Sequence, residues 1–552
     1  MPRDRCGVLR RICIDGGELV SFDPQFAYDG DRSGLPPTLP YLPAWRGSWN
    51  IPGATNSDAI VGNQVDYSLR LRRASRAEAR GFDPGSPGSP GPGSGPSFSR
   101  CTLPVLLLAD WPYNFGEFFA NGATAADHLL RRLRMLPDRS ATLVLVTPSG
   151  LGLLPFQRAL LAHLSSRPLV SLDELAAEAE AAEAAATAAG GAHAPRRVGW
   201  SAEGVPVSCF ERVVVCKVEG SPQPPFVTAS AVVQHLLTGG QGGQGLPPDP
   251  LGFGPDQPET LRVLIEARGG GARTIRNLPQ LLSACEQPGW RGGPFTRLAC
   301  RALPAFDTPS LHGSARFRAT VAAVRSAHVL VTVHGAGGAN SFFLQPDSPA
   351  VSAGAGPNGV GVDGGSAPPA TARALLEIRP CGFGSGFNWW VDVHMAVHLP
   401  RTNGQVRFHA YNLEDPAQCS PADWAAEAAK GGANTRAGLG HMLRDQHVTP
   451  RPDGLLAMLA HVAATLRDPA AYKAAEQAKR LHGYALPYSG GGGAAEAAAA
   501  AGGAGGEKGA GGMGGEAGGA WGPGGGVVLG PLGVTNLTAH VAAGAEFLLP
   551  PG

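Results

Sequence analysis

Short, uninterrupted apolar runs recur along this chain and constrain its fold more than any other feature. Examples are LVLVT at 143–147 and HVLVTV at 328–333. Strands that are covered on both faces, as in parallel sheets, read as continuous apolar runs. Helical segments such as Ala125–Leu136 and Ala315–Ser326 separate or precede these runs, and strands that alternate with helices indicate parallel sheets joined by crossovers. The chain is therefore predicted to be α/β. The predicted strands are Leu103–Ala109, Leu143–Thr147, Phe210–Val218, Leu261–Glu266, His328–Val333 and Leu375–Arg379.

Glycine and proline divide the chain into units. Its 552 residues exceed one ordinary domain, and its 79 glycines and 50 prolines stand mostly in blocks. Such blocks are typical of linkers and disordered inserts. Two α/β domains are predicted, and the carboxyl ends of their strands are expected to bind ligand in a cleft between them. The predicted units are an N-terminal domain 1–237 with a flexible insert 84–99, a linker 238–258, a C-terminal domain 259–485 with an insert 352–372, and a mostly disordered tail 486–552.

Charge and cysteine content argue against several classes of protein. The formal net charge is +1, with no basic run, so no nucleic-acid partner is expected. The nine cysteines form no CxxC pair, and no metal site is predicted. Disulfides involving Cys209 or Cys216 and buried free thiols both remain open. No apolar run approaches the ~20 residues of a membrane span, and residues 1–22 lack the centre of a signal peptide. We expect a soluble chain, or a fragment without its membrane anchor.

The segment HGAGGAN at 334–340 carries the clearest functional signal. It follows an apolar strand and leads into an expected helix, whose first amides and dipole would attract an anion such as a diphosphate. The backbone of Gly335, Ala336 and Gly337 would line this cradle. His334 would donate a hydrogen bond to phosphate, and Asn340 would cap the helix or contact the nucleotide. The alternative is a strand-to-helix turn without a ligand.

This segment resembles the hallmark of glycosyltransferase family 61, His-Gly-Ala-Gly-Leu-Thr-Asn, which Phe-Leu, Pro and a Glu-bearing strand follow. Here HGAGGAN precedes Phe343-Leu344, Pro346 and the strand LLEIRP, which contains Glu377. Gly338 and Ala339 depart from the family's Leu and Thr, and the 352–372 insert separates the loop from the Glu-bearing strand.

Two upstream segments extend the resemblance. A strand that ends in Arg268 precedes Arg273-Thr-Ile-Arg-Asn277, similar to the family's Arg-x-Ile-x-Asn. Many relatives also carry Asn-x-x-His-x-x-x-Asp, where this chain has Asn114, then Glu117 and Asn121 in place of the His and the Asp. Glu117 must then substitute as the acceptor-activating base, or the protein is altered or inactive.

The resemblance implies a GT-B-like fold, in which two Rossmann-type domains face a cleft. It also implies inverting sugar transfer from a nucleotide donor, expected to be a UDP-sugar, to a glycan or glycoprotein acceptor in the Golgi or endoplasmic reticulum lumen. No additional cofactor is required.

The expected site residues fall into two groups. Catalysis is assigned to Glu117 as base and to His334, which helps to stabilise the departing diphosphate. Donor binding is assigned to arginines, which suit phosphate because their planar forks stay charged, to the glycine loop and to neighbouring polar residues. Glu377 would accept hydrogen bonds from ribose or sugar hydroxyls, or form a structural ion pair. The donor-binding set is Arg268, Arg273, Asn277, His334, Gly335, Ala336, Gly337, Asn340 and Glu377.

Two other readings compete. A His-Gly-x-Gly-Gly turn after a strand is also typical of the oxyanion loop of α/β-hydrolases, but the Gly-x-Ser-x-Gly elbow that those enzymes need occurs nowhere in the chain. A non-catalytic protein that binds a nucleotide-sugar or carbohydrate is the second reading, and the Glu117 and Asn121 departures agree with it.

Overall fold

A computed structural model of the chain describes its strands, its helices and the loops next to them. The described residues are 6–15, 18–23, 47–50, 64–67, 69–75, 98, 102–109, 111–135, 141–147, 152–175, 177, 208–218, 221, 223–238, 245–247, 250–254, 257–268, 273–304, 314–344, 372–381, 406–413, 415–422, 445–479 and 484–488. The predicted inserts 84–99 (except Phe98) and 352–372 (except Ala372), and the tail beyond 488, lie outside them.

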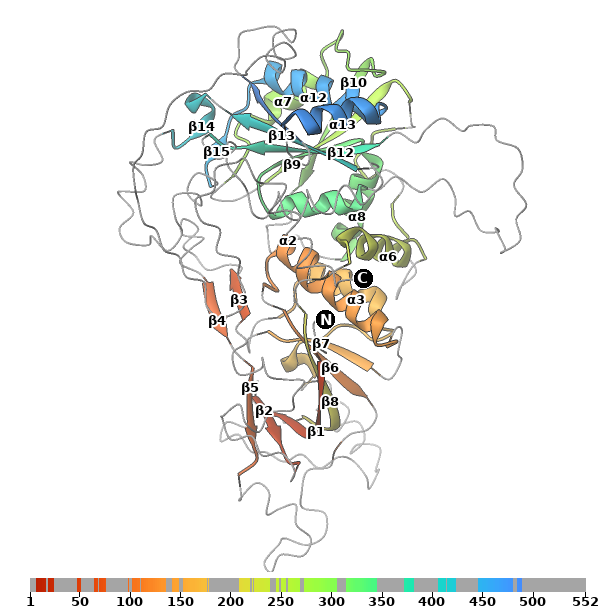
Figure 1. Cartoon of the computed structure of the whole chain (residues 1–552), viewed down its shortest axis with the longest axis vertical. Helices are drawn as coiled ribbons and strands as arrows, with labels where there is room; N and C mark the ends of the chain where they lie inside the picture. The colour runs from red at the N-terminus through yellow and green to blue at the C-terminus, as the bar shows by residue number, and fades with distance from the viewer. Residues whose placement is uncertain are drawn as a thin grey trace, which may run out of the picture.

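Two six-stranded sheets form the framework (Figure 1). The first has the order β5-β2-β1-β8-β6-β7 and the second the order β10-β9-β11-β12-β13-β16. The first sheet consists of β1 (Cys6–Asp15), β2 (Glu18–Ser21), β5 (Arg70–Arg73), β6 (Leu103–Leu108), β7 (Ala141–Leu145) and β8 (Ser208–Lys217). The second consists of β9 (Thr260–Ala267), β10 (Arg297–Pro304), β11 (Val329–Val333), β12 (Arg373–Arg379), β13 (Val406–Leu413) and β16 (Tyr484–Tyr488).

The α/β class and all six predicted strands are confirmed, but the first sheet is not wholly parallel. Its β6, β7 and β8 are parallel to one another, as are all six strands of the second sheet. In contrast, β1 runs antiparallel to both β8 and β2. Strand β1 escaped prediction because Arg10 and Arg11 interrupt its apolar pattern, and β2 and β5 are only four residues long.

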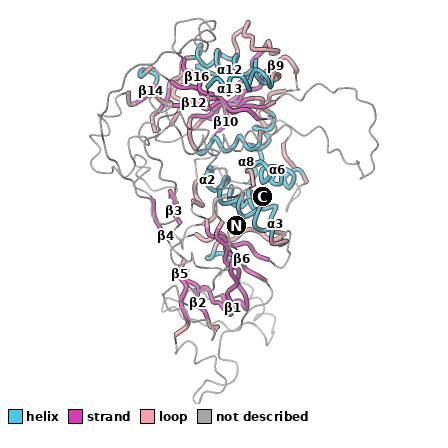
Figure 2. The backbone as a smooth tube through the Cα atoms, in the orientation of Figure 1, coloured by secondary structure: helices cyan, strands magenta, loops and turns pink. Residues whose placement is uncertain are grey.

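Helices from both halves lie between the two sheets, and further helices cover the far face of the second sheet (Figures 1 and 2). Two short pairs, β3 (Gly47–Asn50) with β4 (Gln64–Tyr67) and β14 (Cys419–Ser420) with β15 (His447–Val448), complete the strands. The helical segments are α2 (Phe115–Glu117), the π-helical η3 (Phe118–Ala123), α3 (Thr124–Arg132), α4 (Pro155–Leu161), η4 (Ala162–Leu164), α6 (Pro225–Leu237), α7 (Leu278–Cys285), α8 (Ser314–Ser326), the 3-10 helix η6 (Ala336–Phe343), η8 (Pro416–Gln418), α12 (Pro452–Leu466) and α13 (Pro469–Lys479).

Successive residues of the central strands enter different cores, which explains their continuous apolar runs. In β11, Leu330 faces the core between the sheets, whereas Val329, Val331 and Val333 face the core beneath α7 and α12. Side chains on a strand alternate between its faces, so a strand that is buried on both needs an apolar residue at every position.

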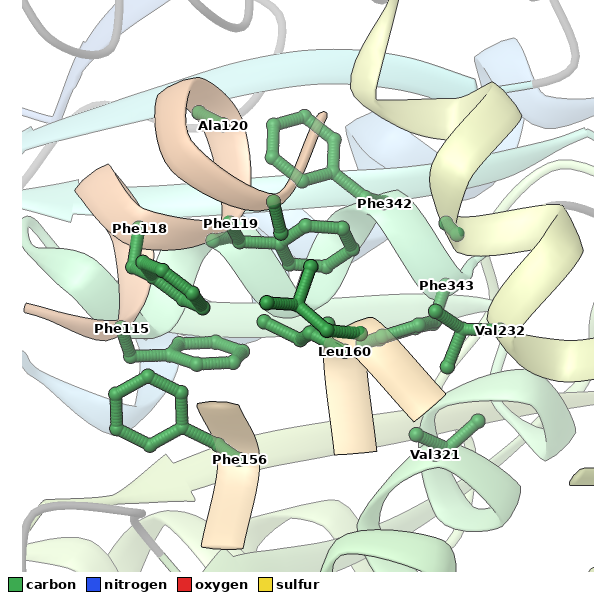
Figure 3. Close-up of a cluster of buried hydrophobic side chains, with 14 of the residues drawn as sticks. Phe115, Phe118, Phe119, Ala120, Phe156, Leu160, Val232, Val321, Phe342 and Phe343 are labelled. Carbon is green, nitrogen blue, oxygen red and sulfur yellow. The ribbon is translucent and has the colours of Figure 1, made fainter. Parts of the chain in front are cut away.

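One apolar core is continuous between the halves. Phe119 of η3 packs on Phe342 and Phe343 of η6, with ring centroids 5.3 and 5.1 Å apart (Figure 3). Phe226 of α6 contacts Phe342 at 5.3 Å, and Phe317 of α8 contacts Phe343 at 6.0 Å. These aromatic contacts attach the segment after the glycine loop to both halves of the chain.

Four disulfides join described cysteines, and the remaining Cys101 lies outside the described residues. Cys6–Cys216 and Cys13–Cys209 cross-link β1 to β8 at directly opposite positions. The sequence alone left the partners of Cys209 and Cys216 open, because it does not show that β1 pairs with β8.

Removal of these two bonds is expected to be strongly non-additive. Once Cys6–Cys216 is closed, Cys13–Cys209 closes a loop of only about 15 residues. Replacing both Cys13 and Cys209 with Ala should therefore lower the free energy of unfolding by about 3 kcal/mol. Removal of Cys6–Cys216 as well opens the remaining loop of 210 residues, which should lower the free energy of unfolding by about 5 kcal/mol more. Urea denaturation measures both losses. Equal losses from the single and the double removal would contradict this arrangement.

Among the described helices, none combines the length and the apolar character that crossing a membrane requires.

Candidate functional site

The predicted donor-binding residues meet where three parallel strands end. β11 lies between β9 and β12, with Val331 opposite Ile265 and Val333 opposite Ile378. The carboxyl ends of these strands therefore share one edge of the sheet. His334 continues β11, and its backbone N–H donates to the carbonyl oxygen of Ile378 at 3.0 Å. This shared edge brings together residues that lie up to about a hundred positions apart in the sequence.

Two arginines converge on Gly335. Its φ of 152° belongs to a region that side chains rarely adopt. A Cβ atom built on Gly335 would lie 2.5 Å from Nη1 of Arg268 and 2.9 Å from Nη1 of Arg273. Two guanidinium groups that approach one point can both bind an anion there, because each presents charged N–H donors in a planar fork. The structure thus brings together both predicted arginines and the predicted loop.

The turn after Gly335 differs from the expected cradle. Residues 336–343 form a 3-10 helix, and the Gly338 N–H donates to the Gly335 carbonyl oxygen at 3.0 Å, so this amide is already used within the turn. Ala336 and Gly337 remain half-buried. A regular α-helix does not form because the glycines are poor helix formers and the following Phe342 and Phe343 are both held in the core.

A carboxylate also lies against the loop. A Cβ on Gly337 would collide with both carboxylate oxygens of Glu266, a buried residue near the end of β9. Sequence reasoning did not select Glu266, although an acid at the end of the apolar run LRVLIEAR was a visible signal. A side chain at Gly337 would therefore displace the Glu266 carboxylate, as one at Gly335 would displace the two guanidinium groups.

Glu377 forms the ion pair that was the alternative to a role in sugar binding. One carboxylate oxygen lies 2.7 Å from Nδ1 of His334, and the other accepts from Nε of Arg379 at 2.8 Å. All three side chains are at most 5% exposed. Burial alone would raise the pKa of Glu377, but the charges of Arg379 and His334 outweigh it and lower the pKa. The ionised carboxylate holds the Nδ1 hydrogen of His334 and so orients its ring.

The Arg273–Asn277 segment is fixed by residues distant in sequence. Nε of Arg273 lies 3.2 Å from a carboxylate oxygen of Asp445. The side-chain amide of Asn277 donates to the carbonyl oxygen of Pro450 at 2.8 Å, which makes Asn277 a structural link. Nothing in the sequence around Asp445 indicated this contact, because about 170 residues separate it from Arg273.

Asn340 does not cap a helix, so of the two sequence-based alternatives only contact with the nucleotide remains. It lies inside η6 and is 1% exposed. Within the part of the chain that the structure describes, its side-chain oxygen accepts no hydrogen bond. Its polar group is therefore available for a contact that these residues do not supply.

Glu117 has the properties of an acid or base that acts near neutral pH. Burial raises its pKa to about 7, although a hydrogen bond from Asn121 opposes this shift. That bond, from Asn121 Nδ2 to a Glu117 carboxylate oxygen, is 2.8 Å long. Helix α2, which ends at Glu117, contacts η6. The two residues stand four positions apart, and the helical backbone brings their side chains together.

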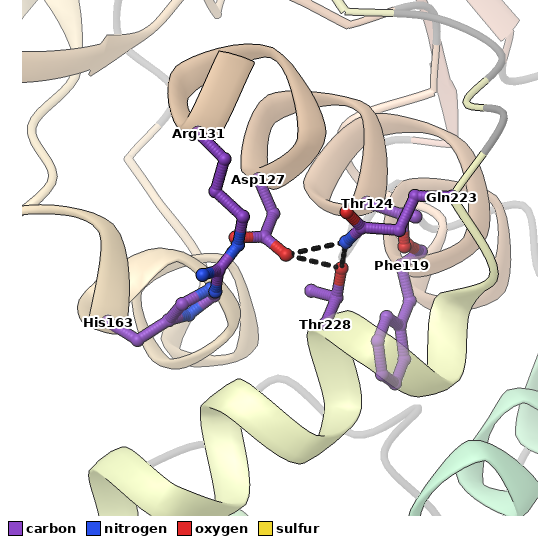
Figure 4. Close-up of polar contacts among 7 residues, drawn as sticks. All are labelled: Phe119, Thr124, Asp127, Arg131, His163, Gln223 and Thr228. Atoms are coloured by element: carbon purple, nitrogen blue, oxygen red, sulfur yellow. Dashed lines mark hydrogen bonds and ion pairs between the residues drawn. The ribbon is translucent and has the colours of Figure 1, made fainter. Parts of the chain in front are cut away.

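Asp127, in contrast, belongs to a structural network (Figure 4). It is fully buried and accepts hydrogen bonds from Gln223 at 2.6 Å, Thr228 at 3.1 Å and Arg131 at 2.7 Å. His163 Nε2 lies 3.3 Å away. Burial would raise the pKa of Asp127, but hydrogen bonds from His163 and Gln223 and neighbouring positive charges lower it overall. These contacts tie α3 to α6.

Replacing Asp127 with Asn is expected to lower the free energy of unfolding by about 3–5 kcal/mol, because it removes one partner of a buried charge network. In the wild type, ionised Asp127 contributes stability that is present above the ordinary carboxyl pKa. This stability is lost as the pH falls through the lowered pKa of Asp127 in the folded state. Chemical denaturation between pH 2 and 7 measures this loss. Asp453→Asn is the control: its exposed pair with Arg451 should contribute less than about 1 kcal/mol. Similar losses at both positions would contradict the assignment.

Among the described residues, no group of three or more His, Cys, Asp or Glu side chains is arranged to hold a metal ion. Compared with known proteins, the chain matches no family model and no curated protein.

Proposed function

We propose that the protein is a glycosyltransferase that binds a nucleotide-sugar, expected to be a UDP-sugar, at the edge of its second sheet. The convergence of Arg268 and Arg273 on Gly335 carries this proposal. Paired guanidinium groups beside a glycine turn suit the diphosphate of such a donor, because each can bind phosphate oxygens in a bidentate way. A GT-B-like arrangement of the two halves, with inversion at the anomeric carbon, is part of the same proposal.

The chemistry requires two functions from the side chains. Negative charge on the departing diphosphate would be stabilised by Arg268, Arg273 and His334. The acceptor hydroxyl, on a glycan or glycoprotein, would lose its proton to Glu117, whose pKa of about 7 suits a base at neutral pH. Four disulfides among the described cysteines agree with an oxidising compartment, such as the proposed Golgi or endoplasmic reticulum lumen.

A nucleotide panel tests the proposal. Calorimetry with UDP, CDP, ADP and GDP should find UDP preferred, and Arg268→Gln should weaken UDP binding at least tenfold, as expected for loss of a charge-assisted pair. The exposed Arg276, in the same motif as Arg273, supplies the matched control Arg276→Gln, which should retain affinity. Failure of every uridine nucleotide to bind, or equal losses in the two variants, would refute the proposal.

A second candidate function is non-catalytic binding of a nucleotide-sugar. The pairing of Glu117 with Asn121, where the resembling family has His and Asp, favours this candidate. The two functions differ in turnover: hydrolysis or transfer of a bound UDP-sugar supports the enzyme, whereas UDP binding without turnover on a panel of donors and acceptors supports the binding protein.

A further inference from the structure

The Cys381–Cys419 disulfide links the end of β12 to a segment beyond the second sheet. Cys381 stands two residues after Arg379, which pairs with Glu377 at the candidate site. Cys419 belongs to β14, and both cysteines are buried. Figure 1 shows the β14–β15 pair at one end of the second half of the molecule.

A ladder of backbone hydrogen bonds continues from Cys419 to the Arg273 segment. Cys419 pairs with Val448 of β15. On its other side, the Val448 N–H donates to the Thr274 carbonyl oxygen at 2.9 Å, and the Val448 carbonyl oxygen accepts from the Arg276 N–H at 2.9 Å. Val448 therefore holds the residues directly after Arg273.

Arg273 requires such support because its backbone is in an unfavourable conformation. Its φ is 59°, in the left-handed region that residues other than Gly, Asn and Asp seldom occupy. The segment that contains Val448 also supplies Asp445 to the Arg273 guanidinium and the Pro450 carbonyl oxygen to Asn277. Both the backbone and the side chain of Arg273 thus depend on residues 445–450.

We propose that the Cys381–Cys419 disulfide is a positioning element for the anion site, which keeps Arg273 over Gly335 through β14 and β15. The bond covalently connects the end of β12, whose Glu377 orients His334, with the segment that holds Arg273. Breaking this bond should loosen Arg273 and weaken nucleotide binding while the second sheet stays folded. The binding part of this inference rests on the proposed function, whereas the mechanical part does not.

The experiment compares two disulfide removals in the same half of the chain. The test variant is Cys381→Ala/Cys419→Ala, and the control is Cys285→Ala/Cys300→Ala, which removes the bond between α7 and β10. Hydrogen exchange of the Arg276 and Val448 amides reports the anchoring without any ligand. Calorimetry with UDP reports binding. We expect at least tenfold faster exchange and at least tenfold weaker UDP binding in the test variant, with changes under twofold in the control.

The outcomes separate the two proposals. Unchanged exchange at Arg276 and Val448, or an equal change in the control, overturns the inference. If exchange responds as expected but UDP does not bind to the wild type, the anchoring is supported and the proposed function fails. Should the test variant not fold, Cys381→Ser/Cys419→Ser replaces it, because serine removes the same bond with a side chain closer in size to cysteine. Unchanged exchange at Arg276 and Val448 in this second variant also overturns the inference.

Discussion

Gly335→Ala is expected to abolish UDP binding, with an affinity loss of at least a hundredfold. The new Cβ would stand 2.5 Å and 2.9 Å from the Nη1 atoms of Arg268 and Arg273, closer than carbon and nitrogen can approach without bonding. Both guanidinium groups must move away from the point on which they converge. The backbone adds a cost of about 1–3 kcal/mol, because alanine seldom adopts a φ of 152°. Calorimetry and thermal unfolding measure the two effects.

Gly289 provides a control that separates steric overlap from backbone strain. It also has a positive φ, 90°, but a Cβ there would meet nothing within 4 Å. Gly289→Ala should therefore lower stability by a comparable backbone cost and leave UDP binding unchanged. Full UDP affinity in Gly335→Ala would mean that the ligand does not depend on the two arginines, and the proposed site would be wrong.

Glu117→Gln is expected to lower sugar transfer by 10²–10⁴-fold while UDP binding is retained, since a glutamine cannot accept the acceptor's proton. In the wild type, kcat should rise with pH through about 7, as Glu117 loses its proton. The variant should lack this ascending limb. Glu211→Gln, at a half-buried position of β8, should leave both the rate and its pH profile intact. A pH profile of Glu117→Gln that matches the wild type would exclude Glu117 as the base.

Stability gives an independent test of the same carboxyl group. The folded-state pKa is raised from 4.5 to about 7, so the stability that protonated Glu117 contributes is present below pH 4.5 and is lost as the pH rises through 7. Glutamine avoids this loss. Glu117→Gln should therefore be more stable than the wild type above pH 7, by roughly 3 kcal/mol, and the advantage should vanish near pH 4. Denaturation at pH 4 and 8 makes the comparison, and equal stabilities at pH 8 would contradict the raised pKa.

Local patterns were sufficient for much of the framework and for part of the site. Continuous apolar runs predicted six strands because burial on both faces demands an apolar residue at every position. The motif resemblance selected Glu117 and Asn121, whose hydrogen bond across one helical turn only the structure shows. The loop after β11 was recognisable from its glycines after an apolar strand, whereas Arg268 and Arg273 were selected by the resemblance to glycosyltransferase family 61.

The contacts made between those motifs depended on the tertiary structure. The antiparallel β1 and its two disulfides, the use of both Glu377 oxygens by His334 and Arg379, and the support of Arg273 by Asp445 all join residues far apart in sequence. Likewise, η6 became a 3-10 helix because Phe342 and Phe343 are drawn into a core to which both halves contribute. Sequence periodicity records which residues are buried, since burial acts on each residue separately. It does not record which distant partner a polar side chain meets, because chain topology and packing decide that contact together.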